Sequence, residues 1–140
     1  MTTKESAQIL AVLTAAYPNA YKNMTEKEAA AVALVWAAQF STVPYDVVFM
    51  ALQKSISTCK YPPTVCEVKE KIGTIHWEAY EELRKQQAGY SELTAEEEAD
   101  YRRICDSTEQ FRNFNSGPEL RDMLPHSRRM LTAADNRKIQ

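Results

Sequence analysis

The stretch that decides the fold is Lys60-Tyr61-Pro62-Pro63-Thr64-Val65-Cys66-Glu67-Val68. The two prolines fix φ and force the residue before them into an extended conformation, so a helix arriving from the N-terminal side must end there. Thr64 and Glu67 have the spacing of a capping box, in which each side chain accepts a hydrogen bond from the backbone N–H of the other residue. The stretch therefore predicts a sharp corner between two helices.

The same capping-box spacing predicts three further helix starts. In each case apolar residues recur behind the box at intervals of three and four, as on one face of a helix. The pairs are Thr2 with Glu5, Thr25 with Glu28, and Thr94 with Glu97. A helix start is also predicted at residues 43–46, because proline is tolerated in the first turn and the carboxylate of Asp46 is favoured at the positive end of the helix dipole.

The N-terminal half is predicted to form a compact bundle of about four helices over residues 1–73, a scaffold domain. No charged residue lies between Glu28 and Asp46, so the helix that begins at Glu28 is expected to be buried on most sides. The helix after the double-proline corner is expected to be short and to end near Gly73.

The second half has a different composition. Residues 78–100 hold eight acids and two bases, a net charge of −6, which is typical of solvated helix surfaces. We expect an acidic extension over residues 74–115, with one helix over about 75–87 and another after Thr94. A turn signal at residues 115–118 then opens a basic amphipathic tail over residues 116–140.

The predicted fold class is all-α: a compact N-terminal bundle of about four helices, followed by two or three further helices. The chain has only three glycines in 140 residues. This is too few for the many turns of β-rich folds or for a phosphate-binding loop.

No arrangement of residues in the sequence predicts catalysis or metal binding. His76 and His126 lie near no nucleophile motif. Cys59, Cys66 and Cys105 lack CxxC spacing and are expected to be reduced. A zinc site of Cys59, Cys66 and His76 would lack a fourth ligand and matches no common spacing. We therefore predict a protein without enzymatic activity, cofactor or metal.

The longest apolar run, residues 29–38, is too short to span a bilayer, and the first five residues are polar. We expect a protein of the cytoplasm with no membrane association. The net charge of −2 gives no overall attraction to nucleic acid.

A local nucleic-acid patch is one interpretation of the residues around the corner, where lysines could neutralise phosphates and a tyrosine could stack on bases. The residues are Lys54, Lys60, Tyr61, Lys69 and Lys71. The alternative, which we favour because no arginine-rich recognition helix accompanies the patch, is a solvent-facing surface covered by lysines.

The order of motifs in the N-terminal half resembles the phage loader and inhibitor family for replicative DNA helicases. The motifs are Ala15-Ala16-Tyr17-Pro18, Met24-Thr25-Glu26 before an Ala-rich helix with Trp36, residues 43–48, and residues 60–68. The resemblance covers about residues 5–73. It implies a small all-helical protein of the bacterial host cytoplasm, without an ATPase. Such proteins bind a hexameric DnaB-type helicase, inhibit it and load it at the origin through a replisome organiser.

The resemblance also implies that the region after the scaffold contacts the helicase, although no shared motif follows Gly73. Our hypothesis is that apolar and basic tail residues supply this contact: Leu120, Met123, Leu124, Arg128, Arg129, Met130 and Leu131. The alternative is that the tail packs onto the helices of the second half. Two other functions stay open: a DNA-binding replisome organiser module, and a non-enzymatic phage regulatory or structural protein.

Overall fold

The structure is a computed structural model, and it describes residues 1–114. Within this part of the chain all regular structure is helical, with no strand. The all-α prediction is confirmed. The elements are α1 (Thr3–Ala16), α2 (Pro18–Tyr21), α3 (Glu26–Gln39), α4 (Tyr45–Thr58), α5 (Val65–Gln87), α6 (Ala95–Thr108) and the 3₁₀ turn η1 (Glu109–Phe111). None of these helices is both long enough and apolar enough to cross a membrane.

The double-proline corner is formed as the sequence predicts. Helix α4 ends at Thr58 and α5 begins at Val65. The backbone N–H of Glu67 donates to the Thr64 Oγ1 atom at 3.2 Å, and the N–H of Thr64 donates to Glu67 Oε2 at 2.9 Å. The boxes at the starts of α1, α3 and α6 are also complete.

We expect the Thr64→Ala variant to lose about 1 kcal/mol of unfolding free energy, because two N–H groups of the first turn lose their capping arrangement. Urea denaturation followed by circular dichroism measures the loss. Thr64→Ser is the matched control, since it keeps the hydroxyl. Equal stability of the alanine and serine variants would show that the box does not hold the corner.

Helix α5 corrects the prediction of two separate helices on either side of residue 73. It is one helix of 23 residues, and Gly73 lies inside it rather than at an end. A glycine inside a helix costs only about 1 kcal/mol relative to alanine. Here the buried face continues past it, through Val68, Ile72, Ile75 and Ala79, so packing outweighs the local helix-ending signal.

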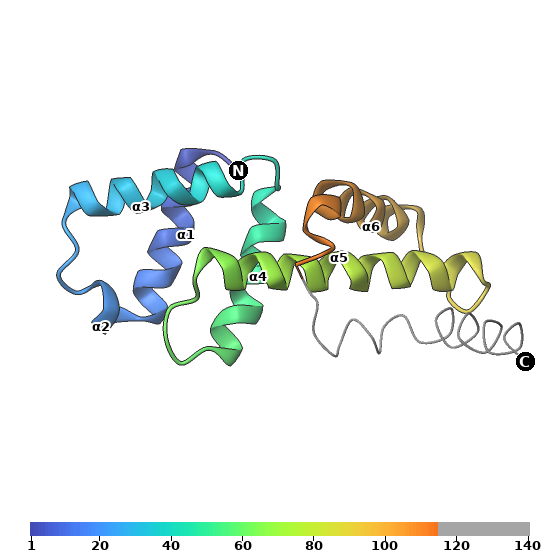
Figure 1. Cartoon of the computed structure of the whole chain (residues 1–140). Coiled ribbons are helices and arrows are strands. Elements are labelled where there is room, and N and C mark those ends of the chain that lie inside the picture. Colours follow the sequence, from blue (N-terminus) through green and yellow to red (C-terminus); the bar gives the residue numbers. More distant parts are fainter. Residues whose placement is uncertain (115–140) are drawn as a thin grey trace, which may run out of the picture.

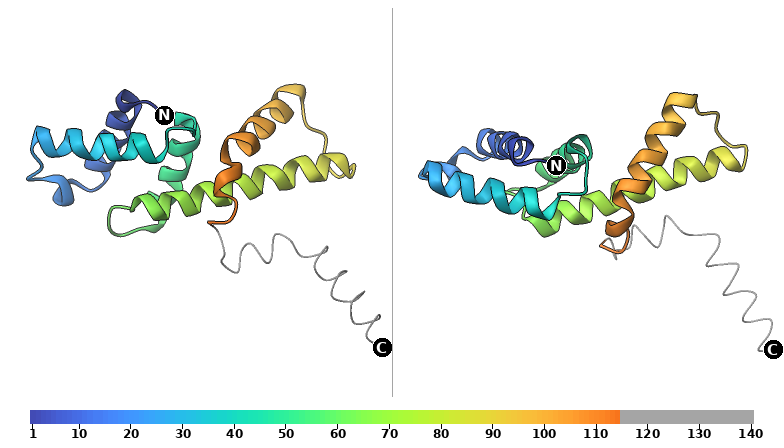
Figure 2. Two further views of the ribbon diagram at one scale, coloured as in Figure 1. Left: turned by 45° about the horizontal axis from the view of Figure 1, so that its top comes forward. Right: turned by 90° about the horizontal axis from the view of Figure 1, so that it is seen from above.

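Helix α5 is the long element on which the rest of the described chain is assembled. Helix α4 packs against its first half and α6 against its second half (Figures 1 and 2). Helices α1 and α3 pack against each other at the other side of α4. The molecule is therefore elongated, with the N-terminal helices at one end and the α5–α6 pair at the other.

One hydrophobic core joins the two halves of the chain. The fully buried Phe40 ring lies 5.6 Å from Trp36 and 6.4 Å from Phe111, measured between ring centroids. Near the same junction, Arg103 of α6 donates to both carboxylate oxygens of Asp46 at the start of α4, at 2.7 and 3.2 Å. The end of the acidic extension is thus packed against the N-terminal bundle.

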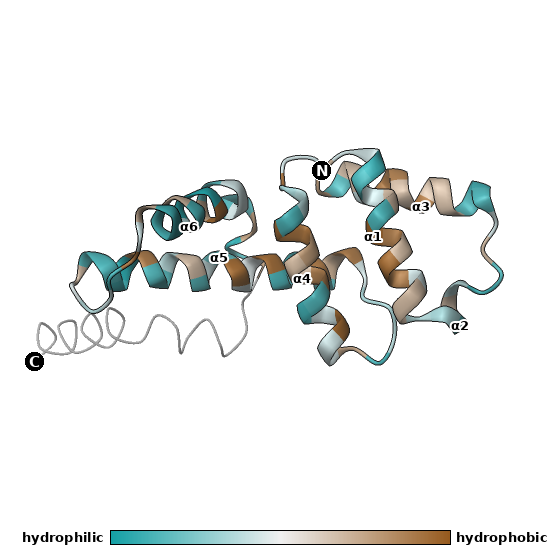
Figure 3. Cartoon of the chain, turned by 180° about the vertical axis from the view of Figure 1, so that it is seen from behind, coloured by the Kyte–Doolittle hydropathy of each residue, from teal (hydrophilic) through white to brown (hydrophobic). Residues whose placement is uncertain are grey.

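Helix α3 corrects a second prediction, that it is buried on most sides. Only Ala33, Trp36 and Ala37 of this helix are buried, whereas Leu34 is 61% and Val35 54% exposed. The helix lies on the outside of the bundle and packs chiefly on α1 (Figure 1). Its lack of charge therefore leaves an uncharged apolar surface rather than a buried one, as the hydropathy colouring shows (Figure 3).

Candidate protein-interaction surfaces

The residues around the corner do not all lie on one face. Tyr61 is 73% exposed, and the Lys60 ammonium lies 5.8 Å from the centre of its ring. Beneath them, the Tyr17 hydroxyl donates to the Cys59 carbonyl at 2.8 Å, which fastens the corner to the end of α1. Lys60 and Tyr61 are thus presented together on a fixed loop.

The other three lysines have separate surroundings. Lys54 pairs with Glu78 of α5 at 3.3 Å. Lys69 donates to the Gln39 side chain at 2.6 Å and lies 5.6 Å from the ring centre of Phe114. Lys71 follows Lys69 by two positions, which is about 200° around a helix, so the two point to opposite sides of α5.

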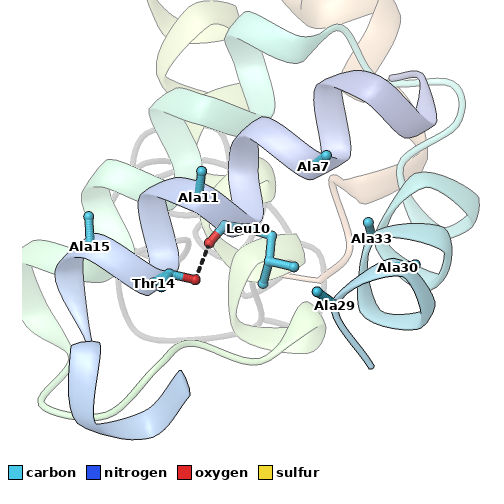
Figure 4. A pocket seen from close by; sticks show the side chains of 8 residues that line it. All are labelled: Ala7, Leu10, Ala11, Thr14, Ala15, Ala29, Ala30 and Ala33. Carbon is cyan, nitrogen blue, oxygen red and sulfur yellow. Dashed lines mark hydrogen bonds between the residues drawn. The ribbon is translucent and has the colours of Figure 1, made fainter. Parts of the chain in front are cut away.

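A groove of about 550 Å³ lies between α1 and α3, and no charged residue lines it (Figure 4). The two helices are joined by the buried Ser6 hydroxyl, which donates to the Ala33 carbonyl at 2.6 Å. The lining residues are Ala7, Leu10, Ala11, Thr14, Ala15, Ala29, Ala30 and Ala33. Sequence reasoning missed this groove, although alanines four residues apart at 7, 11 and 15 mark one face of α1.

A second apolar surface consists of Trp77, Tyr80 and Phe114, which we call the aromatic stripe. The Trp77 and Tyr80 rings meet edge to face at 5.5 Å. The Trp77 Nε1–H donates to the Arg112 carbonyl at 2.9 Å, which places the end of the described chain against α5. Tyr80 and Phe114 are 45% and 41% exposed. Sequence reasoning missed this surface, because Phe114 reaches α5 only through the tertiary fold.

The one buried histidine of the described chain, His76, joins α5 to α6 and η1. It is 3% exposed. Its Nδ1 atom lies 2.9 Å from Thr108 Oγ1, and its Nε2 atom lies 3.5 Å from a carboxylate oxygen of Glu109. Because the Thr108 hydroxyl donates to the Ile104 carbonyl, it accepts from Nδ1–H. This arrangement explains His76 as a packing residue, and it brings no nucleophile to the ring.

The environment of His76 predicts a loss of stability in mild acid. Burial lowers its pKa below the ordinary value of 6.5, and the Glu109 carboxylate opposes this effect only in part. The unfolded chain therefore binds a proton more readily than the folded chain. The stabilising effect of the neutral ring is complete above about pH 6.5 and decreases as the pH falls towards the folded pKa. We expect the urea midpoint to fall between pH 7.5 and pH 5.

The pH dependence can be assigned with two variants, since the chain has only two histidines. His76→Gln should reduce the change in urea midpoint over this range, and the control variant His126→Gln should leave it as in the unmodified protein. An equal change in the His76→Gln protein would contradict the assignment.

The cysteines show no features of a reactive or metal-binding site. Burial, with the nearby carboxylates of Asp106 and Glu109, raises the pKa of Cys105 to about 11, so its thiol stays protonated at neutral pH. Cys59 and Cys66 are free thiols. Within residues 1–114, no three His, Cys, Asp or Glu side chains are grouped so that they could hold a metal ion.

The predicted tail contact lies outside the described residues. It consists of Leu120, Met123, Leu124, Arg128, Arg129, Met130 and Leu131. What the structure places near it is the last described residue, Phe114, which belongs to the aromatic stripe.

Comparison with known proteins agrees with the helical bundle and its corner. Residues 1–69 match the model of a family described by the N-terminal domain of the gene 39 protein, the helicase loader of phage SPP1. No curated protein and no solved structure matches the chain. The match covers α1 to α4, the double-proline corner and the first turn of α5. Through residues 1–69, the chain therefore belongs to this N-terminal domain family, which is a family of phage replication proteins that load and inhibit helicases.

Proposed function

We propose that this protein binds a hexameric DnaB-type replicative helicase, holds it inactive and delivers it to the phage origin, in the cytoplasm of the bacterial host. The match of residues 1–69 to the N-terminal domain of the phage helicase loader is the observation that carries the proposal. The protein acts by binding, without catalysis, cofactor or metal. A replisome organiser is the second partner that this role requires.

The proposal divides the work between segments of the chain. Residues 1–73 serve as the scaffold, residues 74–115 as an acidic helical extension, and residues 116–140 as the segment that contacts the helicase. An apolar and basic segment suits this contact, because interfaces are centred on a few large apolar or arginine anchors. The leucines and methionines at 120, 123 and 124 have the helical spacing of such anchors.

Size-exclusion chromatography with a DnaB-type hexamer, with and without nucleotide, tests the proposal. We expect the protein to elute with the hexamer and to lower its rate of ATP-dependent unwinding. Separate elution under both conditions, at concentrations where the hexamer is intact, would contradict the proposal.

The part of the tail is tested by substitution in the full chain. Replacing Leu120, Met123 and Leu124 by serine should weaken helicase binding at least tenfold, since anchors of this kind each contribute about 2 kcal/mol or more. The matched control replaces Ile139, an apolar residue of the same tail outside the proposed contact. Undiminished binding by the triple variant would place the contact elsewhere, with the groove between α1 and α3 as the next surface to test.

DNA binding is the second candidate function, and the exposure of Tyr61 beside Lys60 is the observation that favours it. Fluorescence anisotropy with single- and double-stranded DNA at several salt concentrations decides between the functions. Direct binding through lysines must weaken steeply as salt rises. No binding at low salt would remove this candidate.

A further inference from the structure

The aromatic stripe lies where the described chain ends. Phe114 is its last member, and Trp77 holds the chain two residues earlier through the Arg112 carbonyl. Exposed aromatic rings on a helix that packs its other faces against α4 and α6 form a surface that lacks a covering partner among residues 1–114. The chain continues from this surface for 26 further residues.

We propose that residues 119–131 of this chain are the partner that covers the aromatic stripe. The first apolar residue of the segment is Leu120, six positions beyond Phe114, and six residues span at most about 20 Å. Trp77 and Tyr80 are three positions apart, about 4.5 Å along the helix axis. The segment can therefore reach both rings directly from Phe114.

The side chains of the segment match the chemistry of the stripe. Methionine sulfur makes favourable contacts with aromatic rings, and arginine guanidinium groups stack on them. Residues 119–131 contain two methionines, Met123 and Met130, and three arginines. The groove between α1 and α3, the other apolar surface, is lined by alanines and offers no ring to such side chains.

Charge supports the same pairing. Glu70 and Glu81 lie seven positions before and four positions after Trp77, so they share its face of α5. Glu81 is already paired with Arg84 at 2.9 Å. Residues 78–100 carry a net charge of −6, whereas residues 119–140 hold five bases and three acids. A basic segment is thus attracted to this half of the molecule rather than to the uncharged groove.

This docking has a consequence for regulation. The side chains at 120, 123 and 124 cannot cover the stripe and contact a helicase at the same time. The docked segment is therefore the resting arrangement, and a partner must compete with the stripe for it.

Methyl NMR on the full chain tests the docking without any helicase. The chain has five methionines, so the labelled Met123 ε-methyl signal can be assigned by substitution. We expect this signal to be shifted upfield by the ring currents of Trp77 and Tyr80. Tyr80→Ala should move it towards the position of a solvent-exposed methionine. The matched control is Tyr90→Ala, because Tyr90 is 85% exposed and lies outside the stripe.

A second reporter views the docking from the side of the stripe. With 5-fluorotryptophan the protein gives one signal each for Trp36 and Trp77. Serine at 120, 123 and 124 should shift the Trp77 signal, leave the buried Trp36 signal in place, and contrast with Ile139→Ser, which should shift neither. An unshifted Trp77 signal, or a Met123 signal that Tyr80→Ala does not move, would overturn the docking. Because both measurements use the protein alone, their failure is distinct from a failure to bind helicase.

Discussion

We expect the Phe40→Ala variant to lose about 3–5 kcal/mol of unfolding free energy, a large part of the 5–15 kcal/mol that is typical of a domain. The Phe40 side chain is fully buried and contacts both Trp36 and Phe111. Alanine removes the ring and leaves a cavity at the junction of α3 with η1. Urea denaturation at pH 7.5, followed by circular dichroism, measures the loss.

Leu34→Ala is the matched control for this prediction, because it truncates a large apolar residue of the same helix that is 61% exposed. Its effect should stay within about 0.5 kcal/mol. A large loss for Leu34→Ala would mean that the outer face of α3 is covered in solution.

The second large effect is expected for Phe111→Ala, also about 3–5 kcal/mol. Phe111 is 4% exposed and lies against Phe40, although 71 positions separate the two residues. The residues after position 73 should therefore unfold together with the N-terminal helices. We expect a single transition in the unmodified protein, with the same midpoint for Trp fluorescence and circular dichroism.

Phe114→Ala is the control, since this ring is 41% exposed and stacks on the outside of Phe111. It should cost about 1 kcal/mol or less. Two separate transitions in the unmodified protein, or an effect of Phe111→Ala no larger than that of Phe114→Ala, would show that α6 and η1 fold independently of the bundle.

Features that depend on neighbouring residues were predictable from the sequence. The four Thr–Glu boxes all form, and the double-proline corner separates α4 from α5. A capping box needs only residues three positions apart, and proline acts on its own φ and on the residue before it. Such signals hold wherever the rest of the chain lies.

Features that depend on packing were not predictable. Gly73 was expected to end a helix, but the buried face of α5 continues through it. The uncharged helix α3 was expected to be buried, but Leu34 and Val35 face outward. In both cases the deciding contacts come from residues distant in the sequence, and neither helix propensity nor hydropathy contains them.

The candidate surfaces divide in the same way. The apolar and basic character of residues 120–131 and the lysines near Tyr61 could be found from residue types alone. The aromatic stripe could not, because it needs η1 to fold back onto α5 so that Arg112 meets Trp77. The sequence by itself determined the fold class, the helix starts and the corner, since short-range backbone geometry decides them. Only the tertiary structure decided that α5 is one helix, which face of α3 is exposed, and where the chain leaves the core, because those depend on contacts between distant segments.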